Sequence, residues 1–173
     1  AAHFISVNGH DEPWYYEMTA LGFNYRITDI QCALGLSQLK RIDAIVEHRR
    51  EIASFYSEHL QGVERLRIPE ADPDTRPSWH LYVLRIDFKA LRISRSHFMK
   101  ALLARGIQTQ VHYIPVTHQP YYRERYGFKA GDCPQAELYY EEALSIPIFP
   151  TMKLQEVKKV VKELKRALTG RVA

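Results

Sequence analysis

The sequence of 173 residues has few cysteines and no long apolar run. Its two cysteines, Cys32 and Cys133, lie far apart and show neither a CxxC pair nor a metal-ligand spacing. We therefore expect two free thiols in a reducing compartment, not a disulfide framework or a zinc site. No apolar stretch approaches the ~18 residues that a membrane span requires, and no basic start followed by an apolar stretch suggests a signal peptide. We expect a cytoplasmic protein without a membrane-spanning segment.

Common catalytic motifs are also missing. The chain has no glycine-rich phosphate loop, no Gly-x-Ser-x-Gly and no His-Glu-x-x-His, and it shows no internal repeat or low-complexity segment. Its apolar content of 46% and charged content of 25% are those of an ordinary globular protein. The length fits one domain, or one domain with an extension.

The net charge of +4 would fit a nucleic-acid-binding protein, but the position of the charge does not. Much of the excess lies in a predicted helix near the end of the chain, where basic residues alternate with Glu156 and Glu163, and apolar residues recur every three or four positions. We interpret it as an amphipathic surface helix and expect no nucleic-acid partner. The basic positions of this helix are Lys158, Lys159, Lys162, Lys165 and Arg166.

The order of the predicted elements indicates an α+β fold, a small sheet covered by helices and preceded by one long helix. We expect residues 1–27 to form an irregular segment, and residues 28–173 to form the long helix and the α+β domain. The long helix runs from Thr28 toward Leu60, because apolar residues mark a stripe along it. Strands are predicted at 79–87 and 107–113, around a helix that Ser94 or Ser96 caps and Gly106 ends. Helices follow at 120–126 and from Pro134 through Leu144, then an extended stretch and the basic helix.

Three polar residues stand at the entrance of the long helix. Thr28 and Gln31 form a Thr-x-x-Gln capping box, which satisfies the needs of the helix start. Asn24, Tyr25 and Arg26 precede this box and are not needed for capping. Their side chains therefore either stabilise the loop before the helix or bind a ligand.

The segment VHYIPVTHQPYYRERYG, 111–127, carries the densest set of chemically active side chains. A metal site at His112, His118 and His80 would have no standard ligand spacing, and we expect no metal. Two interpretations remain open. The tyrosines can be half-buried with bonded hydroxyls beside solvated arginines, or the segment can form a pocket for an oxygen-rich anionic ligand, to which phenols, imidazoles and guanidinium groups donate.

Three separated motifs carry a family resemblance. LGFNYRITDIQCALGLSQLKRID, GIQTQVHYIPVTHQPYY and AELYYEEALSIPIFPTMKLQEVKKVVKEL resemble, in this order, the DegT/DnrJ/EryC1/StrS sugar aminotransferases, which depend on pyridoxal 5′-phosphate (PLP). PWYYEM, joined to the first motif, looks most like one bacterial branch, which makes a 4-amino sugar nucleotide on the way to pseudaminic acid, a cell-surface sugar. The resemblance implies the small C-terminal domain of a fold-type I PLP-dependent transferase, with a mostly antiparallel sheet.

The resemblance also implies roles for single residues. Asn24 would hydrogen-bond the PLP phosphate of the partner subunit in a homo-oligomer, although an Asx turn that only stabilises the loop is the alternative for this residue. The remaining candidates would line the substrate side, near the sugar of a UDP-linked keto-sugar. They are Tyr25, Arg26, His112, Tyr113, His118 and Gln119.

The chain departs from the family pattern in what it does not contain. The lysine that binds PLP, the aspartate that pairs with its ring nitrogen and the aromatic residue that stacks on the ring would lie upstream of Asn24, and the first eleven residues do not match the pattern. We therefore expect the C-terminal part of an aminotransferase that transfers an amino group from glutamate, without the large PLP-binding domain, without bound PLP and inactive alone. The alternative is a non-catalytic α+β module for association or regulation.

Overall fold

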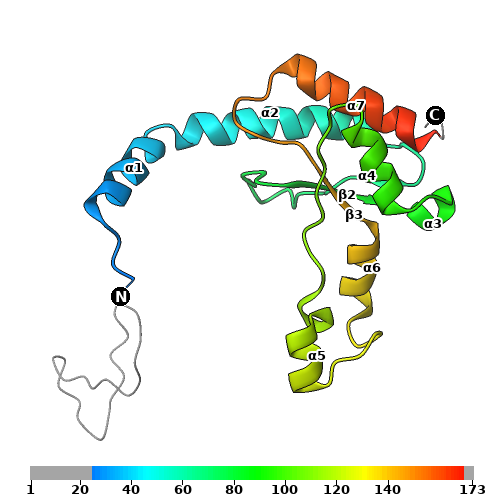
Figure 1. Cartoon of the computed structure of the whole chain (residues 1–173). Coiled ribbons are helices and arrows are strands. Elements are labelled where there is room, and N and C mark those ends of the chain that lie inside the picture. The colour runs from blue at the N-terminus through cyan, green and yellow to red at the C-terminus, as the bar shows by residue number, and fades with distance from the viewer. Residues whose placement is uncertain (1–24, 170–173) are drawn as a thin grey trace, which may run out of the picture. The chain divides into compact units, whose positions relative to one another are not determined.

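The computed structural model describes residues 25–169 (Figure 1). The chain divides into two units, Ala1–Lys40 and Arg41–Ala173. The first unit contains helix α1, Asp29–Leu39. The predicted capping box is confirmed: the Gln31 amide donates to Thr28 Oγ1 at 3.3 Å, and the Thr28 amide donates to Gln31 Oε1 at 2.8 Å. No residue of α1 is buried, so its apolar side chains lie on the surface.

The predicted single helix from Thr28 toward Leu60 is wrong. The chain forms α1 and a separate helix α2, Ile42–Leu60, and the interruption falls at Lys40 and Arg41. Arg41 has φ −114° and ψ 0°, in the bridge region between helix and strand. Neither proline nor glycine marks the interruption, so the sequence carries no ordinary signal for it.

A three-stranded antiparallel sheet lies at the centre of the second unit. The strands are β1, Leu66–Arg67, β2, Tyr82–Ile86, and β3, Ala143–Ile146, in the order β1-β2-β3. Leu66 lies opposite Ile86, and Leu84 lies opposite Leu144. Alternate residues of β2 are buried, which gives the sheet one apolar face.

Two predicted boundaries are corrected by this sheet. The predicted strand at 107–113 is only an isolated bridge between Gln110 and Ser145. The helix that begins at Pro134 ends at Glu142, not at Leu144, because the backbone from Ala143 onward pairs with β2. Pairing with a distant strand satisfies the same backbone groups that a longer helix would use.

Six further helical segments lie in the described part of the second unit, which ends at Thr169. The Ser94 hydroxyl accepts from the amide of His97 at 3.2 Å, so Ser94 is the cap that the sequence suggested. Gly106 has φ +76°, which suits glycine, and lets the chain turn back after α4. The segments are α3, Phe88–Leu91; α4, Arg95–Leu103; η1, Val116–His118; α5, Pro120–Tyr126; α6, Pro134–Glu142; and α7, Leu154–Leu168.

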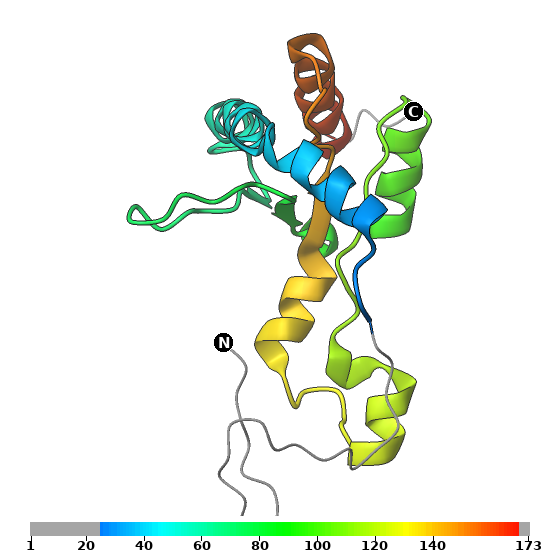
Figure 2. The same cartoon turned by 90° about the vertical axis from the view of Figure 1, so that its left-hand side faces the viewer.

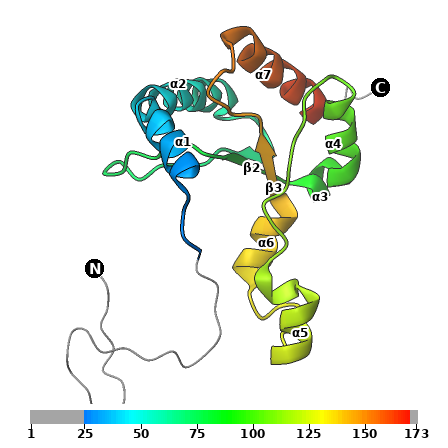
Figure 3. The same ribbon diagram turned by 60° about the vertical axis from the view of Figure 1, so that its left-hand side comes forward.

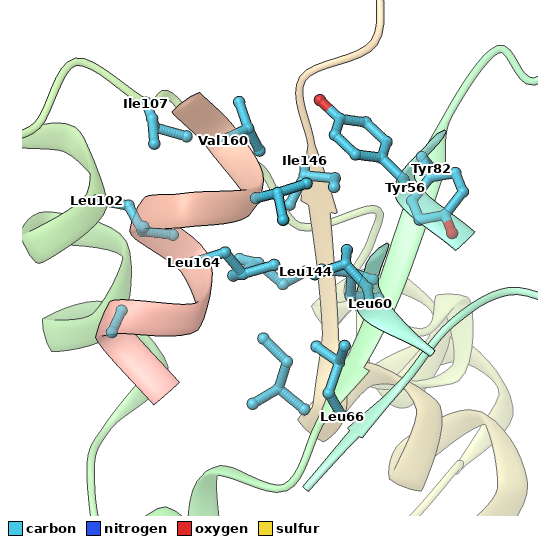
Figure 4. Packing of buried hydrophobic residues seen from close by; sticks show 14 of the residues in the cluster. Tyr56, Leu60, Leu66, Tyr82, Leu102, Ile107, Leu144, Ile146, Val160 and Leu164 are labelled. Carbon is cyan, nitrogen blue, oxygen red and sulfur yellow. The ribbon is translucent and has the colours of Figure 1, made fainter. Parts of the chain in front are cut away.

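Helices α2, α7 and α4 cover one face of the sheet, with α7 between the other two (Figure 3). Figure 4 shows the core between them, where Leu164 of α7 meets Leu144 of β3, and Tyr56 of α2 lies near Tyr82 of β2. The buried Tyr56 hydroxyl donates to the Pro147 carbonyl at 2.8 Å. This architecture confirms the predicted α+β class with a small antiparallel sheet covered by helices.

The basic helix α7 forms as predicted. Its apolar residues from Val157 to Leu168 enter the core, whereas all of its lysines are exposed. Helices α5 and α6 lie at the end of the second unit away from α7 (Figure 2).

Candidate functional site

The predicted site residues fall in both units. Asn24 lies outside the described residues. Tyr25 and Arg26 are exposed and directly precede the capped start of α1 in the first unit. His112, Tyr113, His118 and Gln119 belong to the second unit, in the segment between α4 and α5.

His112 is fixed at the edge of the sheet. Its Nδ1 lies 2.8 Å from Oγ of Ser145, which is buried in β3. The backbones of Ser145 and Gln110 exchange two hydrogen bonds, of 2.8 and 3.1 Å, and this bridge carries the chain to His112. The serine hydroxyl can donate to Nδ1 or accept from it, and in either case the contact holds the ring at this position.

A groove of about 600 Å³ opens beside His112. Hydrogen-bonding side chains from four separate segments line it, together with apolar residues such as Ile107, Ile146 and Val160. Such a mixture of polar and apolar side chains is typical of small-molecule sites. The polar lining residues include His80, Gln108, Gln110, His112, Ser145 and Lys159.

Arg49 of α2 holds two walls of this groove together. Its Nη1 lies 3.0 Å from the carbonyl oxygens of Trp79 and His80 and 3.1 Å from that of Ile148. His80 and Ile148 both line the groove, from segments far apart in the sequence. This role cannot be predicted from the sequence, because an arginine within a predicted amphipathic helix is normally expected to be solvated.

The other candidates of the segment do not line the groove. Tyr113 is 72% exposed, and its ring meets that of His112 edge to face at 4.7 Å. His118 instead faces α6, where its Nε2 lies 3.1 Å from Oε1 of Glu137. Gln119 is the N-cap residue of α5. The structure therefore separates His112 from His118.

Glu137 is a polar residue of this region that the sequence analysis missed. Its carboxylate accepts from the amide of Gly131 at 2.8 and 3.0 Å. These bonds, together with the contact to His118, lower the pKa of Glu137. Glu137 therefore connects η1 and the 131–133 loop to α6. In the sequence, the only feature that could have pointed to Glu137 is its place as an acidic residue in the first turn of a predicted helix.

The described residues do not by themselves fit PLP. A lysine that binds this cofactor has to be seated beside a carboxylate in a shielded site. Every lysine of the chain is exposed, and the close pair of Lys89 with Glu141, at 2.6 Å, is also on the surface. Across residues 25–169, no group of three or more His, Cys, Asp or Glu side chains is placed to hold a metal ion. No helix in this part of the chain has the length and apolarity to cross a membrane.

Comparison with known proteins gives one consistent result. The sequence profile of the DegT/DnrJ/EryC1/StrS aminotransferase family matches residues 2–165, so the expectation that the first eleven residues depart from the family pattern is wrong. The spore coat polysaccharide biosynthesis protein SpsC of Bacillus subtilis is 40% identical over 158 residues, which are 91% of this chain and 41% of SpsC. The chain thus spans about 40% of the length of the curated relatives that it matches.

Solved structures of similar fold are also aminotransferases. The PLP form of the putative sugar aminotransferase Spr1654 from Streptococcus pneumoniae has a TM-score of 0.80 at 25% identity, over 92% of this chain and 40% of that one. Helicobacter pylori PseC, an aminotransferase involved in the biosynthesis of pseudoaminic acid, has a TM-score of 0.79 at 25% identity, over 93% of this chain and 43% of PseC.

Proposed function

Because this chain belongs to the DegT/DnrJ/EryC1/StrS aminotransferase family, we propose that it is the C-terminal part of a PLP-dependent sugar-nucleotide aminotransferase. The full enzyme would move an amino group, with glutamate as donor, to C4 of a UDP-linked 4-keto-6-deoxy sugar. The observation that carries the proposal is the family match along residues 2–165. The similarity to PseC supports a substrate on the route to pseudaminic acid.

The candidate residues of the first unit and those of the second unit have different proposed roles. Asn24 would hydrogen-bond the PLP phosphate of the partner subunit, and Tyr25 and Arg26 would lie toward the sugar nucleotide. An amide and a guanidinium are natural donors to phosphate and carbonyl oxygens. PLP would supply the electron sink of the reaction when bound in the complete enzyme.

In the second unit, His112 is the strongest candidate for contact with the sugar. Its ring is held by Ser145 and lines the groove, so it can offer a fixed donor or acceptor to a hydroxyl. Tyr113 lies directly beside it and is exposed. His118 and Gln119 would position the sugar indirectly, because His118 binds Glu137 and Gln119 starts α5.

We further propose that the protein forms a homo-oligomer through α1. The helix buries none of its residues, and Ile30, Leu34, Leu36 and Leu39 are each more than 60% exposed. Apolar surface of this extent favours association with a second copy. Light scattering at micromolar concentration should give at least a dimer, and a single monomeric species would refute this proposal.

The chain alone should not catalyse amino transfer. Its lysines are all exposed, so added PLP should react weakly and at several of them. The test is to incubate the chain with PLP, dialyse it, and measure the absorbance of lysine-bound cofactor and the formation of amino sugar. One stoichiometric, retained cofactor with turnover above the free-PLP background would contradict the proposal.

The function itself is tested in a chimera. The segment of SpsC that matches this chain is replaced by this chain, and the purified chimera is loaded with PLP and assayed with glutamate and UDP-linked 4-keto sugars. We expect amino transfer, with a loss of activity in His112→Ala and none in Lys100→Ala, an exposed residue of α4. A folded chimera that retains PLP but aminates none of these sugars would refute the proposed function.

A further inference from the structure

Helix α5, Pro120–Tyr126, presents a surface of aromatic rings around an arginine. The guanidinium of Arg125 lies 5.9 Å from the ring centroids of both Tyr121 and Tyr126. The rings of Tyr122 and Tyr126 stack at 6.0 Å with an interplanar angle of 24°. We call these four residues, Tyr121, Tyr122, Arg125 and Tyr126, the α5 surface.

The α5 surface is open to solvent. Helix α5 buries none of its residues, and Tyr121 and Tyr126 are 59% and 60% exposed. Three of its seven residues are tyrosines. The rings flanking Arg125 also limit its freedom, because cation–π contacts favour one placement of the guanidinium. A planar donor between exposed rings is thus partly arranged in advance for a ligand.

We propose that the α5 surface binds the nucleoside diphosphate half of a sugar nucleotide. The tyrosine rings would stack on the base, and Arg125 would donate to the diphosphate oxygens. This inference rests on the proposed function for its substrate class. The segment that carries His112 and Gln119 leads into α5, which begins at Pro120.

The charge of the helix favours a mononucleotide over a nucleic-acid strand. A strand is bound by a continuous positive groove that follows its backbone. Within α5, Glu124 stands between Arg123 and Arg125, so the positive charge is local. This local positive charge suits the two or three phosphate oxygens of one diphosphate better than the extended backbone of a nucleic-acid strand.

The binding test uses the full chain alone and requires no catalysis. Calorimetry and NMR titration measure the Kd of UDP, uridine and inorganic pyrophosphate, with circular dichroism as a check on folding. We expect UDP to bind more tightly than uridine or pyrophosphate, and to shift the ring signals of Tyr121 and Tyr126. Tyr126→Ala should weaken UDP binding roughly tenfold, and Tyr126→Phe less than about twofold, because phenylalanine keeps the stacking ring.

Arginine variants separate the two halves of the ligand. Arg125→Ala should weaken UDP binding roughly tenfold and leave uridine binding unchanged, because only UDP carries the diphosphate. Arg76→Ala, at an exposed loop position outside α5, is the matched control and should bind UDP as the parent does.

The proposal is overturned if UDP does not bind, if Arg125→Ala and Tyr126→Ala bind it like the parent, or if a short single-stranded oligonucleotide binds the α5 surface more tightly than UDP. These outcomes are independent of the proposed function. An active chimera whose KM for the sugar nucleotide does not change in Arg125→Ala would reject the α5 surface only. An inactive chimera beside a chain that binds UDP as described would reject the aminotransferase function only.

Discussion

Replacing Arg49 tests whether one guanidinium assembles the walls of the groove. Its Nη1 carries two hydrogens and faces three carbonyl oxygens, of Trp79, His80 and Ile148, at 3.0–3.1 Å. Two charge-assisted bonds can therefore form at one time. Arg49→Ala removes both bonds and detaches the 79–80 and 148 segments from α2.

The expected loss of stability follows from these bonds. Each hydrogen bond from a charged donor contributes about 1.5–3 kcal/mol. His80 is exposed, so its freed carbonyl can bind water and recover part of this energy. We therefore expect Arg49→Ala to lower the free energy of unfolding by about 2–4 kcal/mol, which corresponds to a fall in Tm of roughly 5–15 °C in a chain of this size.

Urea unfolding followed by circular dichroism measures this change, and the His112 ring signals in NMR report on the groove. Arg49→Lys should recover less than half of the loss, because an ammonium cannot reproduce the fixed geometry of the guanidinium. Arg76→Ala is the control and should stay within about 0.5 kcal/mol of the parent. A loss below about 0.5 kcal/mol in Arg49→Ala would show that the groove does not depend on these bonds.

Three further predictions concern single residues. Both ring nitrogens of His48 face acceptors, Nε2 the Met152 carbonyl at 2.9 Å and Nδ1 the Glu51 carboxylate at 3.0 Å, and these contacts raise the pKa of His48. The stabilisation is complete below about pH 6.5 and is lost as pH rises through the higher folded-state pKa, so urea unfolding should show a decline that His48→Gln flattens. The Glu142 side chain is 12% exposed and lies 2.7 Å from Arg85. Glu142→Gln should lower the free energy of unfolding by about 1–3 kcal/mol in urea, less than the loss of a fully buried ion pair, because Arg85 is partly exposed. An unchanged free energy of unfolding would refute this prediction. In the SpsC chimera, Asn24→Ala should weaken PLP binding roughly ten- to hundredfold in a cofactor titration, and unchanged affinity would reject the cross-subunit role.

The helix termini show where sequence reasoning succeeds. Thr28 with Gln31 and Ser94 cap the helices at which the sequence predicts them, and Pro134 begins α6. The apolar spacing of α7 likewise predicts the buried side chains from Val157 to Leu168, although Leu154 at the start of the same stripe is 55% exposed. These features depend on contacts within three or four residues, so local sequence carries enough information.

The elements that were missed or misjudged depend on distant partners. Strand β1 has only two residues, Leu66 and Arg67, and exists because β2 lies beside it. The end of α6 at Glu142 is set by the pairing of β3 with β2, and the predicted strand at 107–113 keeps one bridge. No local pattern encodes these choices, since the competing structures satisfy the same backbone groups.

The sequence by itself determined the α+β class, the capped helix starts and, through three separated motifs, the family of this chain. Only the tertiary structure decided that His112 is held by Ser145, that His118 instead faces Glu137, and that Arg49 joins the segments of His80 and Ile148. Each of these contacts joins residues that lie from 19 to 99 positions apart, since the fold and not the local chain brings them together. The candidate residues could therefore be found in the sequence, but their division into a groove and a separate α5 surface required the structure.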